Sequence, residues 1–429
     1  MWIEFSRSWR DRESLRNDRH DLDAAAYRRG YRRTVLPRPI ARLLPFCHGT
    51  LCLLLFSCIA AAQTRQENGT DFSNFRPRRE MPGESFVGQE SCASCHAEKS
   101  RTQSHTAMRH ALSIASESDV LRTHPRMTFR AGGYSYEIVS DGKQNSYRVT
   151  NGKETISEPI LYSFGNAHVA QTYVYRRNGK LYEGRVSYYA AIDGLDWTIG
   201  DILNPPPSLE EAAGRDISGD EARNCFSCHG TAAVLSTKLQ LDRLIPGVTC
   251  EACHGPGGSH ASIMLFTPGA SVDIFNPKKL DAEILSQEFC GACHRGVDTV
   301  AMMPDLGGLN NVRFQPYRLF NSRGHDPKDA RLACTACHDP HVDLKRGDNS
   351  YDSNCTTCHT TRSAGQAAGQ KNFATASKRA DVSPAAKSCP VASERCVSCH
   401  MPKVELPGAH FKFTDHRIRI ARQGEAYPY

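Results

Sequence analysis

The chain is 429 residues long, which is enough for two or three ordinary domains. Its hydrophobic fraction of 39% and its mean hydropathy of −0.50 are low for a conventional apolar core of this size. The net charge of +7 depends on residues 1–62, which hold eleven Arg and six acidic residues. The remainder therefore lies near +2 and gives no support for nucleic-acid binding.

Residues 1–62 have the composition of an export leader. A basic segment precedes an apolar run over residues 49–62 that ends in small residues, so we expect a secretory signal cleaved after Ala62. The run is too short to predict a membrane span, and the mature chain is expected to have no transmembrane helix. The predicted location is periplasmic or extracellular. Residues 63–88 are polar, with Pro and Arg, and are predicted to be a linker.

Residues 126–200 alternate Tyr, Val, Thr and Phe with polar residues. Turn pairs interrupt the alternation at Gly132-Gly133, Asp141-Gly142, Asn151-Gly152 and Asn178-Gly179. This pattern is typical of β-hairpins, and it predicts a small antiparallel β-meander. The meander is inserted between a first segment, 89–125, and a larger domain, 222–429, with a proline-containing linker over 201–221.

The frame Cys-x-x-Cys-His occurs seven times, once in 89–125 and six times in 222–429. Two cysteines three residues apart can each form a thioether with a porphyrin vinyl group, and the next histidine then reaches the iron. The predicted attachment residues are Cys92, Cys95, Cys225, Cys228, Cys250, Cys253, Cys290, Cys293, Cys334, Cys337, Cys355, Cys358, Cys396 and Cys399. The predicted proximal ligands are His96, His229, His254, His294, His338, His359 and His400.

Zinc sites and disulfides also use cysteine pairs, but both explain this pattern poorly. Zinc knuckles work in pairs, whereas seven is odd, and zinc gives no reason for a histidine after every pair. Fourteen of the eighteen cysteines fall in the frame and three of the rest lie in the leader, which argues against a disulfide framework. We therefore predict seven covalently attached haem c groups.

Seven haems would supply the apolar core that the composition lacks. The expected fold class is a multihaem cytochrome c, with mainly short α-helices and loops around the haems and the inserted β-meander. A chain without haem is not expected to fold.

Nine histidines outside the leader and the motifs remain as sixth ligands of the irons. The strongest candidates by position are His105, His260, His341 and His416, followed by His325, His410 and His110. His124 and His168 are weaker candidates. Because no methionine has a spacing that demands ligation, we expect mostly low-spin, low-potential, bis-histidine haems.

The segments around three motifs resemble a known group. Cys253-His254-Gly-Pro-Gly-Gly-Ser-His260, Cys337-His338-Asp-Pro-His341 and the Thr414-Asp415-His416 tail resemble multihaem c-type cytochromes of the doubled Cys-x-x-Cys-His superfamily. That superfamily includes the tetrahaem cytochrome that takes electrons from hydroxylamine oxidoreductase. The resemblance covers residues 90–110 and 220–420. It implies a secreted protein with closely packed haem pairs that pass electrons along a chain, here with seven haems rather than four.

The sequence thus predicts an electron-transfer protein that acts between extracytoplasmic redox partner proteins, with no catalytic residue. The alternative is a reductase of nitrite, hydroxylamine or a sulfur oxyanion, which needs one haem with an open sixth position. Pentahaem nitrite reductases resemble the chain in general plan but carry Lys in place of one motif His, and no Cys-x-x-Cys-Lys occurs here. An oligomer or an association with a membrane complex is left open.

Overall fold

The computed structural model describes residues 85–142, 144–200, 205–235, 238–270, 274–327, 329–359, 389, 391–392, 394–422 and 424–428. The predicted leader and all but the last four residues of the linker that follows it lie outside these ranges. Among the helices that the structure describes, none has the length and apolar character needed to cross a membrane.

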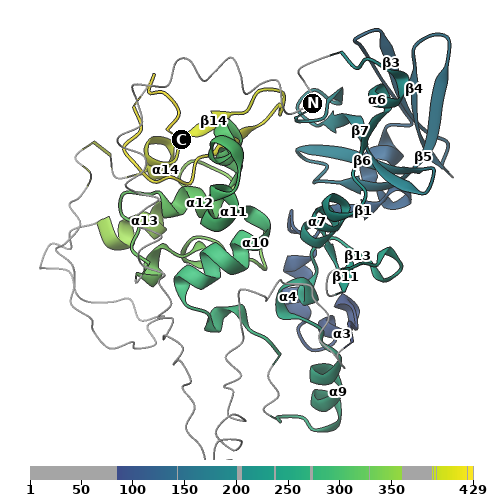
Figure 1. Ribbon diagram of the computed structural model, residues 1–429. Coiled ribbons are helices and arrows are strands. Elements are labelled where there is room, and N and C mark those ends of the chain that lie inside the picture. Colours follow the sequence, from purple (N-terminus) through teal and green to yellow (C-terminus); the bar gives the residue numbers. More distant parts are fainter. Residues whose placement is uncertain are drawn as a thin grey trace, which may run out of the picture. The chain divides into compact units, whose positions relative to one another are not determined.

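A nine-stranded antiparallel sheet occupies the first part of the described chain (Figure 1). Its strands are β1 (Leu112–Ile114), β2 (Arg126–Ala131), β3 (Tyr134–Ser140), β4 (Asn145–Thr150), β5 (Thr155–Phe164), β6 (Ala170–Arg177), β7 (Lys180–Tyr189), β8 (Gly194–Trp197) and β9 (Gly214–Asp216). Strands β2 to β8 follow one another as a meander, while β1 pairs with β5 and β9 pairs with β7. The expected meander is present, but the prediction that it is small is wrong, because strands from both flanking segments join it.

The sheet folds as the alternation of its residues requires. In β3 and β4 every second side chain is buried, including Tyr136, Ile138, Tyr147 and Val149. The sheet curves until its end strands meet: the Trp197 ring of β8 lies 5.2 Å from the Phe129 ring of β2 and 5.5 Å from the Tyr136 ring of β3, edge to face in both cases. These side chains belong to the larger of two apolar clusters.

The rest of the described chain consists of short helices and two-stranded ribbons. The α-helices are α3 (Gln89–Ala93), α4 (Ala97–Gln103), α5 (Asp119–Thr123), α6 (Leu209–Ala213), α7 (Asp220–His229), α8 (Cys250–His254), α9 (Gly258–Phe266), α10 (Gly291–His294), α11 (Val297–Ala301), α12 (Gln315–Phe320), α13 (Asp352–His359) and α14 (Cys396–His400). The other helical turns are η2 (Ala115–Glu117), η3 (Leu241–Arg243), η4 (Pro277–Lys279), η5 (Ile284–Cys290), η6 (Pro304–Arg313), η7 (Ala330–Leu332) and η8 (Cys334–Ala336). The ribbons pair β10 (Gly230–Thr231) with β13 (Ile245–Pro246), β11 (Val234–Leu235) with β12 (Lys238–Leu239), and β14 (Lys403–Glu405) with β15 (Lys412–Thr414).

Both apolar clusters lie between residues 112 and 244. The second cluster joins the sheet to α7, where Phe226 is buried and makes edge contacts with Tyr162 and Phe164 of β5. Beyond residue 244, the buried apolar residues that the structure describes, such as Phe289 and Val300, belong to neither cluster. A chain of short helices with so few packed apolar side chains needs another source of apolar surface.

Candidate haem-binding sites

Each of the seven motifs begins on a helical turn, and in five of them the helix ends at the motif histidine. Six motifs occupy α7, α8, the junction of η5 and α10, η8, α13 and α14, and the first spans the end of α3 and the residue before α4. In the first motif the His96 N–H donates to the Cys92 carbonyl at 2.8 Å, as in an α-helix. Because residues four apart share a helix face, the first cysteine and the histidine of a motif project to the same side.

Several motif cysteines approach cysteines of another motif. All fourteen except Cys358, whose side chain is not described, are in no disulfide. Thiol–thiol hydrogen bonds join Cys92 to Cys250 and Cys290 to Cys334. The bond from Cys92 lowers the pKa of the Cys250 thiol to about 7. Attachment points far apart in sequence thus meet in space.

Three motif histidines face a second histidine. The ring centres are 6.5 Å apart for His96 and His260, and the ring planes differ by 16°. They are 6.0 Å apart for His254 and His341. Two imidazoles that bind one iron through one nitrogen each would have centres about 6.3 Å apart, given a metal–nitrogen bond of about 2.0 Å.

The third pair has the same spacing, with 6.3 Å between the ring centres of His338 and His416. Burial lowers the pKa of His254 and of His338, and lowers that of His416 to about 4. These three rings are therefore neutral at pH 7, the form that offers a nitrogen lone pair to a metal. The paired residues fit a bis-histidine haem.

Backbone carbonyls orient several of these rings. The Nδ1 atoms of His229, His254 and His400 each lie 2.9 Å from a carbonyl oxygen, those of Ala111, Phe275 and Arg419 respectively. Since a carbonyl only accepts, each Nδ1 must carry the proton, which leaves the Nε2 lone pair for a metal. The sequence could not reveal these partners, because any residue supplies a carbonyl.

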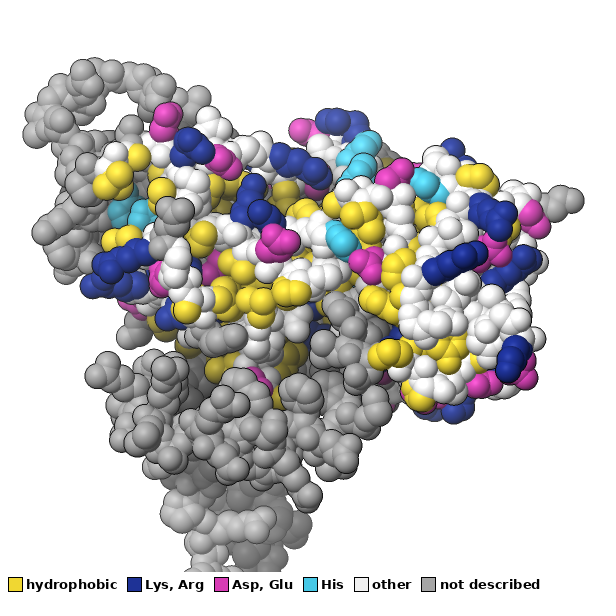
Figure 2. Space-filling view, turned by 90° about the horizontal axis from the view of Figure 1, so that it is seen from above, with side chains coloured by type: hydrophobic (Ala, Val, Ile, Leu, Met, Phe, Trp, Pro, Cys, Tyr) yellow, Lys and Arg dark blue, Asp and Glu magenta, His cyan; other side chains and the backbone are white. Residues whose placement is uncertain are grey.

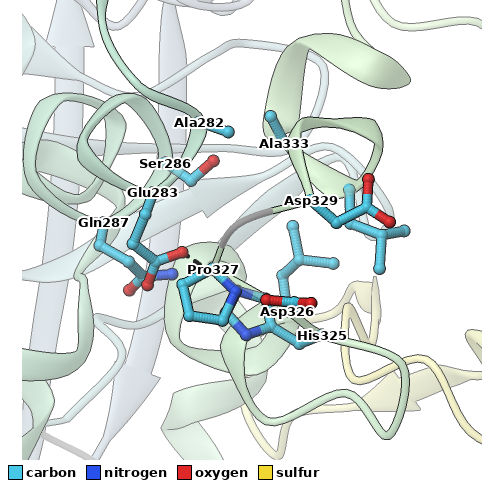
Figure 3. Close-up of a pocket in the computed structure, with 11 residues that line it drawn as sticks. Ala282, Glu283, Ser286, Gln287, His325, Asp326, Pro327, Asp329 and Ala333 are labelled. Carbon is cyan, nitrogen blue, oxygen red and sulfur yellow. Dashed lines mark hydrogen bonds and ion pairs between the residues drawn. The ribbon is translucent and has the colours of Figure 1, made fainter. Parts of the chain in front are cut away.

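Two other predicted ligands have Nε2 engaged by a carboxylate. His325 Nε2 lies 3.1 Å from Glu283 Oε2, in a pocket lined also by Asp326 and Asp329 (Figure 3). His410 Nε2 lies 2.8 Å from Asp196 Oδ2 of β8. In this arrangement neither ring presents Nε2 to an iron.

The remaining predicted ligands, His105 and His110, are exposed. His105 Nδ1 lies 2.7 Å from the Arg101 carbonyl, which leaves its Nε2 facing outward. Within the described residues the structure pairs neither with a motif histidine. Figure 2 shows histidine side chains at the surface in several separate places, among interspersed acidic and basic residues.

Sequence inspection missed one acidic residue inside a motif. Glu251 follows Cys250, yet its side chain is buried and accepts three backbone N–H bonds, from Val87, Gly88 and Gly257. It therefore binds the segment before the first motif to the third motif. A charged residue between the motif cysteines gives no signal of this role in the sequence.

Comparisons with known proteins agree with this chemistry. Residues 207–255, which include the second and third motifs, match the family described as "Cytochrome c554 and c-prime". The chain is 26% identical over 160 residues to the "Multiheme cytochrome MtrA" of Shewanella baltica (strain OS185), a match that covers 33% of this chain and 39% of that relative.

The chain thus matches well under two thirds of that relative's length. No solved structure matches the chain. The two similarities and the repeated motif together support a multihaem c-type cytochrome with covalently bound haem.

Proposed function

We propose that the chain holds seven haem c groups and conducts electrons between redox partner proteins outside the cytoplasm. The spacing of the three histidine pairs is the observation that carries this proposal. Bound haem supplies reversible one-electron chemistry. The protein contributes the thioether links, the axial imidazoles and their orientation.

The proposed second ligands come from distant parts of the chain. His260 serves the motif of His96, His341 that of His254, and His416 that of His338. Each of these ligands follows the motif two places further along the chain. Such crossed ligation links the first, third, fifth and seventh motifs in succession and gives the three irons concerned a rigid environment.

Contacts between attachment cysteines support a relay rather than isolated sites. Besides the pairs of Cys92 with Cys250 and of Cys290 with Cys334, a hydrogen bond joins Cys355 and Cys396. Since each thioether fixes the edge of a porphyrin, neighbouring haem edges would lie close together. Electron tunnelling requires such short separations.

The proposed location and organisation follow from the sequence. Residues 1–62 would direct export and be removed. Residues 89–125 and 222–429 would carry the haems, with the sheet of residues 126–200 as a scaffold between linkers at 63–88 and 201–221. A reductase with one open haem is the alternative that the following measurements would reveal.

The test is a haem count and a spin-state count on exported protein. We expect seven haems per chain by pyridine haemochrome assay and predominantly low-spin ferric signals in electron paramagnetic resonance. His260→Ala and His341→Ala should each convert one haem to high spin. His168→Ala, which alters an exposed histidine beyond the end of β5, should change nothing.

Far fewer than seven haems would refute the haem assignment. If either ligand variant left every haem low-spin, the ligation of that iron would be wrong. Binding of carbon monoxide or nitrite to a ferrous haem of the unmodified protein would favour the reductase.

A further inference from the structure

The side chains of Arg318 and Asp415 form an ion pair with no exposed surface. Arg318 lies on α12, and its Nε and Nη2 atoms donate to the two carboxylate oxygens of Asp415 at 2.8 and 2.9 Å. The contact is therefore bidentate. Taking both charges out of water is costly, so stability alone is a weak reason for such a pair.

The remaining groups of Arg318 are also held. Its Nη1 donates to Pro428 O at 2.7 Å and to Asn311 Oδ1 at 3.3 Å. The guanidinium carbon lies 4.6 Å from the ring centre of Tyr427. The planar group thus has one fixed orientation, which a lysine could not reproduce.

The carboxylate and the backbone N–H of Asp415 are also hydrogen-bonded, as the guanidinium of Arg318 is. Oδ1 also accepts the Arg417 N–H at 3.0 Å, and Oδ2 accepts from Arg419 Nη1 at 2.9 Å. Its own N–H donates to the Pro402 carbonyl at 3.0 Å. Both the side chain and the backbone of Asp415 are therefore fixed.

His416 is the next residue, the second after the end of β15. Its ring projects from the backbone next to the anchored Asp415 and faces His338, so the contacts that fix Asp415 also fix the backbone that carries the imidazole. Ser322, four residues after Arg318, holds the backbone beyond: its Oγ donates to the His416 carbonyl at 3.3 Å and accepts the Ile418 N–H at 2.8 Å. The segment that starts with α12 thus fastens the chain on both sides of this imidazole.

We infer that Arg318 and Asp415 are positioning residues that aim His416 at the iron of the fifth motif. The inference rests on the proposed function, because it takes His416 as the second ligand of that iron. The pair contacts the ligand only through the backbone and leaves the Nδ1–H of His416 to the Thr414 carbonyl, 3.0 Å away. Loss of the pair should loosen the orientation of the imidazole while the thioether links stay intact.

The experiment compares four variants of the exported, haem-loaded protein by electron paramagnetic resonance. His416→Ala identifies the signal of the iron concerned. Asp415→Asn and Arg318→Lys each disturb the pair and should convert that signal to high spin or shift its low-spin g values, with added imidazole restoring low spin. The double variant R318M/D415L replaces both buried charged side chains with apolar side chains of similar size. It should therefore fold while showing the same altered signal.

Glu183→Gln is the matched control, because it breaks the ion pair of Glu183 with Arg215 in the sheet. It should lower the unfolding midpoint without changing any haem signal. If His416→Ala leaves all haems low-spin, the proposed ligation fails and the inference fails with it. If His416→Ala exposes one high-spin haem but the folded double variant keeps the unmodified signal, the ligation stands and the positioning role is refuted.

Discussion

The Gly88 N–H donates a 2.9 Å hydrogen bond to Glu251 Oε2, although 163 residues separate the two. The other carboxylate oxygen accepts from Val87 at 2.9 Å and from Gly257 at 2.8 Å. Glu251 is 1% exposed, so these three N–H groups provide the hydrogen bonds that water would otherwise donate to its carboxylate. One carboxylate thus holds together the starts of two haem-binding segments.

Glu251→Gln should lower the free energy of unfolding by roughly 2–4 kcal/mol, because the amide nitrogen would face N–H donors and leave at least one of them unsatisfied. Chemical denaturation of the haem-loaded protein measures this loss. Glu90→Gln, at an exposed position of α3, is the control and should change stability little. Equal effects of the two substitutions would contradict the role of Glu251.

Asp339 gives His341 a partner that differs from those of the other proposed ligands. Its Oδ1 lies 2.9 Å from His341 Nδ1, and its Oδ2 accepts from Lys99 Nζ at 3.2 Å. A carboxylate at Nδ1 makes an imidazole a stronger donor to a metal than a carbonyl does. Such a ligand favours ferric iron and lowers the reduction potential.

Asp339→Asn should therefore raise the potential of one haem, that of the His254 motif, in a spectroelectrochemical titration. Asp343→Asn removes the same charge four residues away, at an exposed side chain whose Oδ1 accepts the Ala107 N–H at 3.4 Å. It should give a clearly smaller shift. Equal shifts from both variants would mean that the negative charge alone sets the reduction potential and that the hydrogen bond to His341 has no effect.

Local signals in the sequence were enough to predict the motifs and the hairpins. Asn178 and Gly179, which join β6 to β7, both have positive φ, as a tight hairpin turn requires. Non-local pairing was not readable. Strands β1 and β9 join the sheet through partners far along the chain, and three-residue strands carry too little alternation to be recognised.

The same limit applies to the candidate ligands. Spacing drew attention to His260, which follows His254 by six residues, yet its ring faces His96. The sequence ranked His410 with His325 and His110 as a candidate ligand, but in the structure its ring contacts Asp196 of the sheet. Proximity to a motif marks a histidine as a candidate ligand, whereas tertiary packing decides which motif histidine it faces.

Buried tyrosines give the sheet a predictable response to alkali. Burial, reinforced by Asp196, raises the pKa of Tyr189 to about 12, and burial raises that of Tyr173 and of Tyr175 as well. The folded state thus holds the phenol proton more tightly than the unfolded state. For Tyr189 the stabilisation is complete below pH 10 and is lost as the pH rises through 12, by up to about 1.4 kcal/mol per pH unit.

Urea unfolding at pH 8, 10 and 11.5 measures this dependence. Tyr189→Phe should cost about 1 kcal/mol at pH 8, because it removes the hydrogen bond from the hydroxyl to the Trp197 carbonyl, 2.6 Å away. It should also make the decline above pH 10 shallower. An unchanged slope would show that Tyr189 ionises freely in the folded protein.

The location of the apolar clusters predicts how the chain behaves without haem. Both clusters lie between residues 112 and 244, and the larger one is formed mainly by strands of the sheet. The sheet can therefore bury its aromatic residues without a cofactor, whereas the short helices beyond residue 250 cannot. The sequence alone predicted that the haem-free chain does not fold, but from these clusters we expect it to be partly folded rather than wholly unfolded.

Limited proteolysis of residues 63–429 produced in the cytoplasm, where haem is not attached, tests this expectation. A protected fragment that contains residues 112–217 should accumulate while the later segments are digested within the first time points. The haem-loaded protein, treated in parallel, should resist cleavage throughout the later motifs as well. Digestion of the sheet as fast as the helices would show that the haems organise the whole chain, because the tyrosine-rich core would then be too weak to form alone.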